Sequence, residues 1–364
     1  MQGNAILCFT GSPFMAGLCC LFSGSQPQDA LEMDEEEHVH EHKDHLPYHR
    51  VSCVIIQITF SLYPKSDSWT KHTNILFSPL SIFASSLMLS LGAKNNSHDQ
   101  TLEGLNFNLT ETPENFIHEC FQQLTFILQQ PDHREQMTMD SSLFTPQNLK
   151  LMDKFVQGVK RLYNSKVIAL NFSDTQRAQN QINEYIEGET HGKIAGLVKE
   201  MEEDTAFALI NYIVFQGKWY DDFEMEHIVE QDFHVNPDMT VVPWSVGTMI
   251  HLRGRFFLYR KLDLSSWVMT ILSTLGITKI FSHDADLSGV TQDAPLKLVK
   301  AVHKTVLTFE EEVTKPTRNT SWSKRDSPQN LSIHFNRPFL FVIKDEYTNC
   351  PLFVGKVINP TTND

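Results

Sequence analysis

The sequence predicts an α+β protein with one folded domain. Three observations lead to this prediction: helical spacing of apolar residues in the first half, strand-like apolar runs in the second half, and no long Pro/Gly/Ser-rich linker after about residue 48. The chain has 364 residues, of which 41% are hydrophobic, and this is enough to fill a sizeable core. The domain is therefore expected to span residues 48–364.

Three segments show the periodicity of amphipathic helices. The first spans Phe116–Leu128 and is bounded by Pro113 and Pro131, which are typical residues at helix ends. The second spans Leu149–Tyr163, and the third carries apolar residues at 182, 185 and 186 and ends near residue 188. Helices are therefore expected to dominate the first half of the domain.

Strand-like runs follow in the later part of the chain. Residues 206–215 are aromatic and β-branched and are apolar on both faces, which suits the centre of a buried sheet. Residues 301–309 alternate apolar with polar side chains, and residues 339–343 and 352–357 give two more strands joined by a polar turn. His303 lies inside this pattern, and a hydrogen-bonded core histidine is favoured over a general base because no nucleophile accompanies it.

The first 47 residues differ in composition from the rest. Residues 1–25 are interpreted as a signal peptide, because an apolar run over residues 14–22 is followed by small residues, although no Lys or Arg precedes Lys43. The alternative is an apolar leader without a function. Residues 26–47 are interpreted as an acidic, His-rich disordered tail, since residues 29–44 hold eight acids against one base.

Charge and cysteine spacing exclude several kinds of partner. The net charge is −14 and no basic block occurs, so nucleic acid binding is not expected. Nothing fixes the geometry of the tail histidines, and the six cysteines show no CxxC spacing, so neither a metal site nor a disulfide framework is predicted. Cys120 is expected to be a buried thiol on a helical apolar face.

Five N-x-[ST] sequons accompany the leader and favour the secretory route, either to the extracellular space or with retention in the endoplasmic reticulum lumen. The apolar N-terminal stretch is too interrupted to predict a membrane span. The candidate glycosylation sites are Asn95, Asn108, Asn171, Asn319 and Asn330.

The sequence carries none of the common catalytic motifs. It has no GxSxG, HExxH, Walker or GxGxxG pattern that would give the carboxylates of the tail or of residues 310–312 a catalytic partner. We therefore predict that the protein is not an enzyme and binds no cofactor.

Three ordered segments resemble the serpin family. Residues 74–82 with 88–94 look like its N-terminal signature, residues 211–219 like its central strand, and residues 335–343 with 351–357 like its C-terminal signature. Further segments resemble the antitrypsin branch of that family, and these are residues 102–111, 275–279 and 285–290. The resemblance implies the serpin fold, with helices packed on a large mixed sheet and on smaller sheets.

The resemblance also implies a serine protease inhibitor that acts through an exposed reactive loop. A protease attacks the loop, and the cleaved loop then inserts into the main sheet as a new strand. The implied loop residues are Thr314, Lys315, Pro316, Arg318, Ser327 and Pro328. Of these, Lys315, Pro316 and Arg318 depart from the small, neutral residues that the family uses there. The usual register places the attacked bond at Ser327–Pro328, while cleavage after Lys324 or Arg325 would be chemically easier.

The resemblance assigns structural roles to five residues near the insertion site, in the regions of the main sheet that are called shutter and breach in this family. These residues are Ser78, Ser81, Asn211, Trp219 and His303. The resemblance also implies an internal deletion between residues 268 and 275, so the fold is expected to be incomplete after residue 268. A lost strand exposes sheet edges, so the chain is expected to be a monomer with a risk of aggregation. The alternatives are a non-inhibitory carrier and a misfolding-prone splice product.

Overall fold

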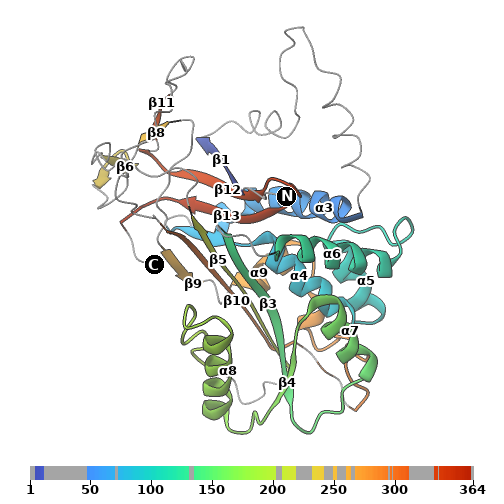
Figure 1. The fold of residues 1–364 in the computed structure, drawn as a ribbon. Coiled ribbons are helices and arrows are strands. Elements are labelled where there is room, and N and C mark those ends of the chain that lie inside the picture. Colours follow the sequence, from blue (N-terminus) through green and yellow to red (C-terminus); the bar gives the residue numbers. More distant parts are fainter. Residues whose placement is uncertain are drawn as a thin grey trace, which may run out of the picture.

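The computed structural model describes residues 5–11, 47–69, 73–130, 135–201, 207–218, 232–241, 249–251, 260–263, 267–293, 296, 298–310, 332–334 and 336–361. Helices and strands are mixed in this part of the chain, in agreement with the predicted α+β class (Figure 1). The helices are α3 (Pro47–Trp69), α4 (Pro79–Ser90), α5 (Asn95–Gly104), α6 (Glu114–Leu128), α7 (Asp153–Tyr163), α8 (Thr175–Glu189), α9 (Trp267–Thr274) and the short 3₁₀ helix η3 (Lys279–Phe281).

The described strands form four sheets. The largest has five strands in the order β4-β3-β5-β10-β9, and a second has four in the order β1-β12-β13-β2, while β6 pairs with β7 and β8 with β11. The strands are β1 (Ala5–Gly11), β2 (Ile75–Phe77), β3 (Glu135–Pro146), β4 (Val167–Leu170), β5 (Ala208–Lys218), β6 (Phe233–Asn236), β7 (Met239–Val241), β8 (Met249–His251), β9 (Arg260–Asp263), β10 (Lys300–Glu310), β11 (Ser332–His334), β12 (Phe339–Asp345) and β13 (Pro351–Val357).

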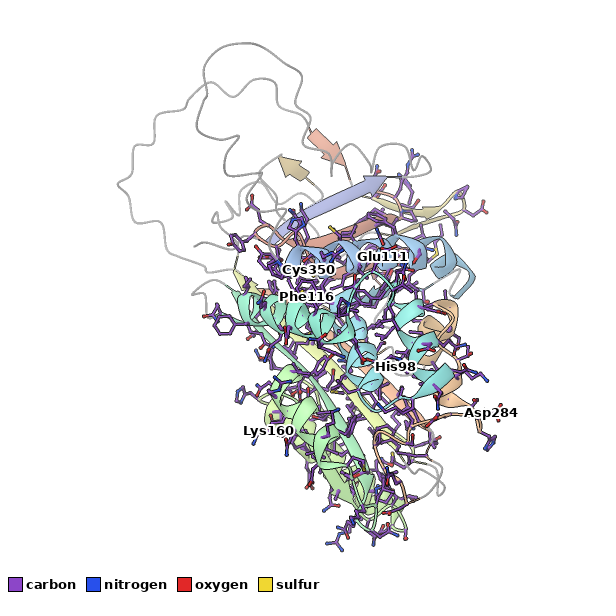
Figure 2. All side chains as sticks on the ribbon, turned by 90° about the vertical axis from the view of Figure 1, so that its right-hand side faces the viewer. His98, Glu111, Phe116, Lys160, Asp284 and Cys350 are labelled. Carbon is purple, nitrogen blue, oxygen red and sulfur yellow. The ribbon has the colours of Figure 1, made fainter. Side chains whose placement is uncertain are left out.

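The central strand β5 of the five-stranded sheet is buried on both faces. Leu209 and Ile213 of β5 join the main core, which also contains buried side chains of α3, α4 and α6. Ile210 and Tyr212 point to the opposite face, where they join a smaller core with α8. Figure 1 shows α8 at the lower left of this sheet and α4, α5, α6 and α7 to its right, and Figure 2 turns the latter side toward the viewer.

Capping residues set the ends of the helices that flank the sheet. Ser78 caps α4, because its side chain accepts a hydrogen bond from the backbone N–H of Ser81 at 3.1 Å and Pro79 occupies the first turn. Asp174 caps α8 by accepting from the N–H of Arg177 at 3.0 Å. Helix α7 ends at Asn164, which adopts the left-handed conformation that asparagine tolerates.

Two sequence predictions differ from the observed elements. The helix expected from Leu149 begins only at Asp153, because residues 149–152 form the connection that leads from β3 into α7. The strands are also not confined to the later part of the chain, since β2, β3 and β4 alternate with helices. The other helices and strands expected from periodicity are present, with bounds shifted by a few residues.

Strand β1 lies within the segment interpreted as a signal peptide. Its backbone pairs antiparallel with β12 over seven positions, from Ala5 opposite Asp345 to Gly11 opposite Phe339. It therefore covers the edge of β12 that faces away from β13. Residues 12–46, which hold most of the predicted leader and tail, lie outside the described residues.

Helix α9 leads directly into residues 275–290, which contain two of the segments that resemble the antitrypsin branch of the family. The chain passes from α9 through Gly276 to η3 with no strand between them. Backbone hydrogen bonds then hold residues 286–290 against the helices: Lys94 N–H donates to Asp286 O at 2.9 Å, and Met152 N–H donates to Val290 O at 2.9 Å. This part of the chain is thus anchored close to the point where the sequence predicts a deletion.

Candidate functional site: the β5–β10 pair

The candidate site is the junction of β5 and β10 in the five-stranded sheet. The two strands are parallel and pair over eleven positions, from Ala208 opposite Lys300 to Lys218 opposite Glu310. Glu310 is the last residue of β10, and the predicted reactive loop follows it in the sequence. A segment that turned back after Glu310 and entered between these strands would run antiparallel to both, which is the more stable pairing.

A buried polar cluster lies at the middle of this junction, on the face that packs on α4. The side chains of Ser78, Ser81, Asn211, His303, Thr305 and Ser141 are each at most 4% exposed. Asn211 and His303 are directly opposite each other in the β5–β10 register, and their side chains are hydrogen-bonded. The cluster therefore joins three strands to the first turn of α4.

Hydrogen bonds satisfy the polar groups of Asn211. Its Oδ1 accepts from the Ser81 hydroxyl at 2.6 Å and from the His303 ring, and its amide nitrogen donates to Ser141 Oγ at 2.7 Å. Buried polar groups without partners are costly, so a complete set of this kind favours one arrangement of α4, β3, β5 and β10.

The surroundings of His303 define its protonation state. Asn211 Oδ1 acts as an acceptor, so Nδ1 of His303 carries the proton. Nε2 then accepts from the backbone N–H of Ser78 at 3.4 Å and from the Thr305 hydroxyl at 2.8 Å. Burial, and to a smaller extent the nearby charge of Lys304, lowers the pKa of His303 to about 3. The imidazole is therefore neutral at physiological pH and serves as a structural hydrogen-bonding group.

Sequence reasoning found part of this cluster. The structure brings together Ser78, Ser81, Asn211 and His303, whereas Trp219 lies outside the described residues. Ser141 and Thr305 were missed. Both lie among other polar residues, Ser141 between Asp140 and Ser142 and Thr305 after Lys304, so no local pattern distinguishes them.

The other predicted site residues fall into two groups. The reactive-loop residues and the sequons at Asn319 and Asn330 lie outside the described residues, as do Lys324 and Arg325. The sequons at Asn95, Asn108 and Asn171 lie on described, exposed positions. Within the described ranges, no cluster of three or more metal-binding side chains occurs, and no helix there is long and apolar enough to span a membrane.

A parallel central pair with a buried Ser/Asn/His cluster beneath it, in a sheet flanked by α4 and α8, corresponds to the fold of the serine protease inhibitors called serpins. The serpin (serine protease inhibitor) family model matches residues 55–271 and 255–360. The chain belongs to the serpin family.

Its relatives lie in the antitrypsin branch, as the sequence segments indicated. The chain is 39% identical over 416 residues to the alpha-1-antitrypsin-related protein of Homo sapiens, covering 96% of this chain and 98% of that protein. It is 40% identical over 412 residues to the alpha-1-antiproteinase of Callosciurus caniceps, with the same two coverages.

Solved serpin structures share the fold. Thyroxine-binding globulin in complex with thyroxine gives a TM-score of 0.71 at 28% identity, covering 86% of this chain and all of that chain. Human glycosylated kallistatin gives a TM-score of 0.71 at 30% identity, covering 87% of this chain and 99% of that chain. The predicted serpin fold is thus confirmed.

Proposed function

We propose that this chain presents the segment after β10 to a serine protease, and that the β5–β10 junction is where the cleaved segment enters the sheet. The observation that carries the proposal is the parallel pairing of β5 and β10, with Asn211 and His303 opposite each other across the junction. An incoming strand would separate these two side chains and form antiparallel pairs with both neighbours. The protein itself would carry out no catalysis.

The residues that follow β10 are unfavourable for this insertion. The burial of both faces of β10 makes them more unfavourable than the sequence alone predicts. Successive residues of a strand face opposite sides, so Lys315 and Arg318 would point to opposite faces of the sheet. Both faces of β10 are buried, since His303 is 1% and Lys304 is 3% exposed. Insertion through residue 318 would therefore bury both charges, and each costs several kcal/mol unless it is paired. Pro316 would also lack a ladder hydrogen bond.

The enzyme that cleaves the loop is expected to be trypsin-like. A proline follows Ser327 in the bond given by the usual register, and most serine proteases do not cleave before proline. Cleavage after Lys324 or Arg325 places a basic side chain in the specificity pocket, which trypsin-like enzymes favour.

The test is the formation of a covalent complex. The full chain is incubated with trypsin, elastase and chymotrypsin and separated by denaturing electrophoresis; trypsin is expected to give an SDS-resistant band, although most of the chain is cleaved without trapping. The variant Lys315→Thr/Arg318→Ala should raise the proportion of complex, because it removes both buried charges. Trypsin with its catalytic serine blocked is the control. The absence of any complex with both the wild-type chain and the variant would contradict the proposal.

The loop chemistry favours a second candidate, a non-inhibitory serpin that binds and carries a ligand. The solved structure of thyroxine-binding globulin with thyroxine is an example of a relative that holds a small molecule. This candidate predicts that the loop is cleaved without insertion, so the unfolding temperature stays the same after cleavage. A rise in Tm on cleavage would exclude it, because insertion adds a strand to the sheet.

The internal deletion is part of the proposal as well. The alignment with the human relative spans 416 residues and exceeds the length of this chain, 364 residues, by 52, which supports a missing block. We place the chain in the secretory pathway as a monomer with a risk of aggregation, extracellular or retained in the endoplasmic reticulum. The misfolded splice product would show no cooperative unfolding transition, whereas the fold described above requires one.

A further inference from the structure

Strand β12 has the composition of a strand that is paired along both edges. Its first five residues, 339–343, are all apolar and include no proline, glycine or charged residue. Natural sheets avoid such sequences at free edges and place charges, prolines or bulges there, because a free apolar edge pairs with other chains. Strand β13 covers one edge of β12, so the other edge requires a partner too.

Both faces of β12 are also covered. Phe341 is 3% exposed and Ile343 is fully buried, and both belong to the main core. On the opposite face, Val342 and Lys344 line a narrow crevice together with Phe60 of α3. With both faces and one edge in contact with the rest of the fold, the outer edge is the place where β12 can bind a further segment.

Strand β1 occupies this outer edge. It pairs with every residue of β12, from Ala5 opposite Asp345 to Gly11 opposite Phe339, in one continuous register. The pairing of β12 with β13, in contrast, contains a register shift. Figure 1 shows β1 alongside β12 at the top of the molecule. The segment thus matches the length of β12 residue for residue.

The sequence of β1 suits this position. The register places Leu7 opposite Ile343 and Phe9 opposite Phe341. Residues directly opposite each other in an antiparallel pair lie on the same face of the sheet, and apolar pairs of this kind stabilise it. The apolar run that predicts a leader, residues 14–22, begins only after β1 has ended, so the two features are separate segments.

The backbone groups of β12 that face β1 can be assigned. The N–H of Asp345 donates to the carbonyl of Cys350 at 3.0 Å, so Asp345 directs its backbone groups toward β13. Successive residues of a strand direct these groups to alternate sides. The residues that direct theirs toward β1 are therefore Leu340, Val342 and Lys344. Their partners in β1 are Thr10, Cys8 and Ile6, in the same order.

We propose that the outer edge of β12 is a strand-docking site, and that its occupant is the segment Ala5–Gly11 of the same chain, which stays in the folded protein as the edge strand of the four-stranded sheet. Residues 12–46 join β1 to α3, and a connection of that length reaches at most about 115 Å. It permits docking within one chain and also an exchange of β1 between two copies, so the test has to separate these two cases.

The test is hydrogen exchange of the full chain, resolved to single amides by NMR. The amides of Leu340, Val342 and Lys344 should be protected in the wild type. Cys8→Pro removes an N–H directed at Val342 in the centre of the pair, so it should accelerate the exchange of these three amides by about tenfold or more. Ala5→Pro is the matched control and should leave their protection unchanged, because Ala5 is the first residue of β1 and directs its N–H away from β12. The amides of β5, in the other sheet, report whether each variant folds.

A second measurement uses the wild type alone and does not depend on how a proline variant folds. Residues of a non-hydrogen-bonded pair have Cα atoms about 4.5 Å apart. Leu7 and Ile343 should therefore show a nuclear Overhauser effect between their Hα atoms, as should Phe9 and Phe341. In a mixture of isotope-labelled and unlabelled protein, these effects should arise within single chains.

Four results would overturn the proposal. The first is the absence of both Hα contacts in the wild type, and the second is equal exchange at β12 in the wild type and a folded Cys8→Pro. The third is contacts between labelled and unlabelled copies, which would assign the edge to a second copy. The fourth is a mature N-terminus beyond Gly11 in protein purified from mammalian cells, where we expect it before Ala5. None of these readouts involves a protease, so the outcome is independent of the proposed function.

Discussion

Replacing His303 with asparagine should change how the stability of the protein depends on pH. The pKa of His303 is about 3 in the folded chain, while an unperturbed histidine has a pKa of about 6.5. Between these values the unfolded chain takes up a proton that the folded chain does not, so this stability is present above pH 6.5 and is lost as the pH falls. The loss amounts to about 2 kcal/mol between pH 7 and pH 5.

The assay is urea denaturation of the wild type and of His303→Asn at these two pH values. The variant should be less stable at pH 7, because it loses part of the cluster around Asn211, but its stability should fall less on acidification. Other titrating groups contribute equally to both proteins, so the difference between the two pH effects isolates His303. The exposed His283 provides a matched control for the substitution itself, and His283→Asn should leave the stability at pH 7 close to that of the wild type.

The reasoning would be refuted if the wild type and His303→Asn lost the same free energy between pH 7 and pH 5. A second measurement uses the wild type alone. NMR of the imidazole nitrogens should show a neutral ring protonated on Nδ1 at both pH values, as the hydrogen bond to Asn211 requires. A cationic ring at pH 5 would contradict the assignment of Nε2 as an acceptor.

Three further predictions concern other parts of the fold. Gly355→Ala should lower the free energy of unfolding by about 1–3 kcal/mol, because a Cβ there would lie 2.2 Å from the Phe341 ring; Gly188→Ala, with nothing within 4 Å, should be neutral or stabilising in the same denaturation assay. Burial alone would lower the pKa of His98, but the carboxylates of Asp99 and Glu114 outweigh it, so the pKa is raised. His98→Gln should therefore reduce Tm more at about pH 6 than at about pH 9, and an equal reduction at both pH values would contradict this. A chain that begins at residue 26, as leader cleavage would produce, lacks β1 and leaves the outer edge of β12 open. It should therefore self-associate more than the full chain, as measured by size-exclusion chromatography. Equal elution volumes would argue against an exposed edge.

Local patterns were sufficient to predict the central strands and the amphipathic helices. The apolar run at residues 206–215, in which Asn211 is polar, indicated a strand buried on both faces, and β5 is such a strand. The start of α7 was predicted too early, because Leu149 and Met152 are partly buried by packing rather than by helix formation. Residues 301–309 alternate in sequence, yet polar Thr305 and Lys304 are both buried, since neighbouring layers cover each face of β10.

The polar cluster around Asn211 and His303 could not be predicted from local sequence patterns. Ser78 and His303 are 225 residues apart, and their contact depends on the parallel pairing of β5 and β10 and on the position of α4. Composition and periodicity do not reveal such a contact; the family resemblance placed Ser78, Ser81, Asn211 and His303 near each other, and it left out Ser141 and Thr305. Both are flanked by other polar residues of β3 and β10, so only the strand pairing shows that they face the cluster.

The four-stranded sheet has a consequence for the synthesis of the protein. Its middle strands, β12 and β13, are made last, while its outer strands, β1 and β2, are made first. The Asn74 side chain likewise donates to the carbonyl of Asn359, 285 residues later, at 2.8 Å. The helices that are synthesised first therefore keep uncovered apolar faces until translation is almost complete. A ribosome that stops even thirty codons early would release a chain that cannot close this sheet, so quality control is expected to discard truncated products entirely.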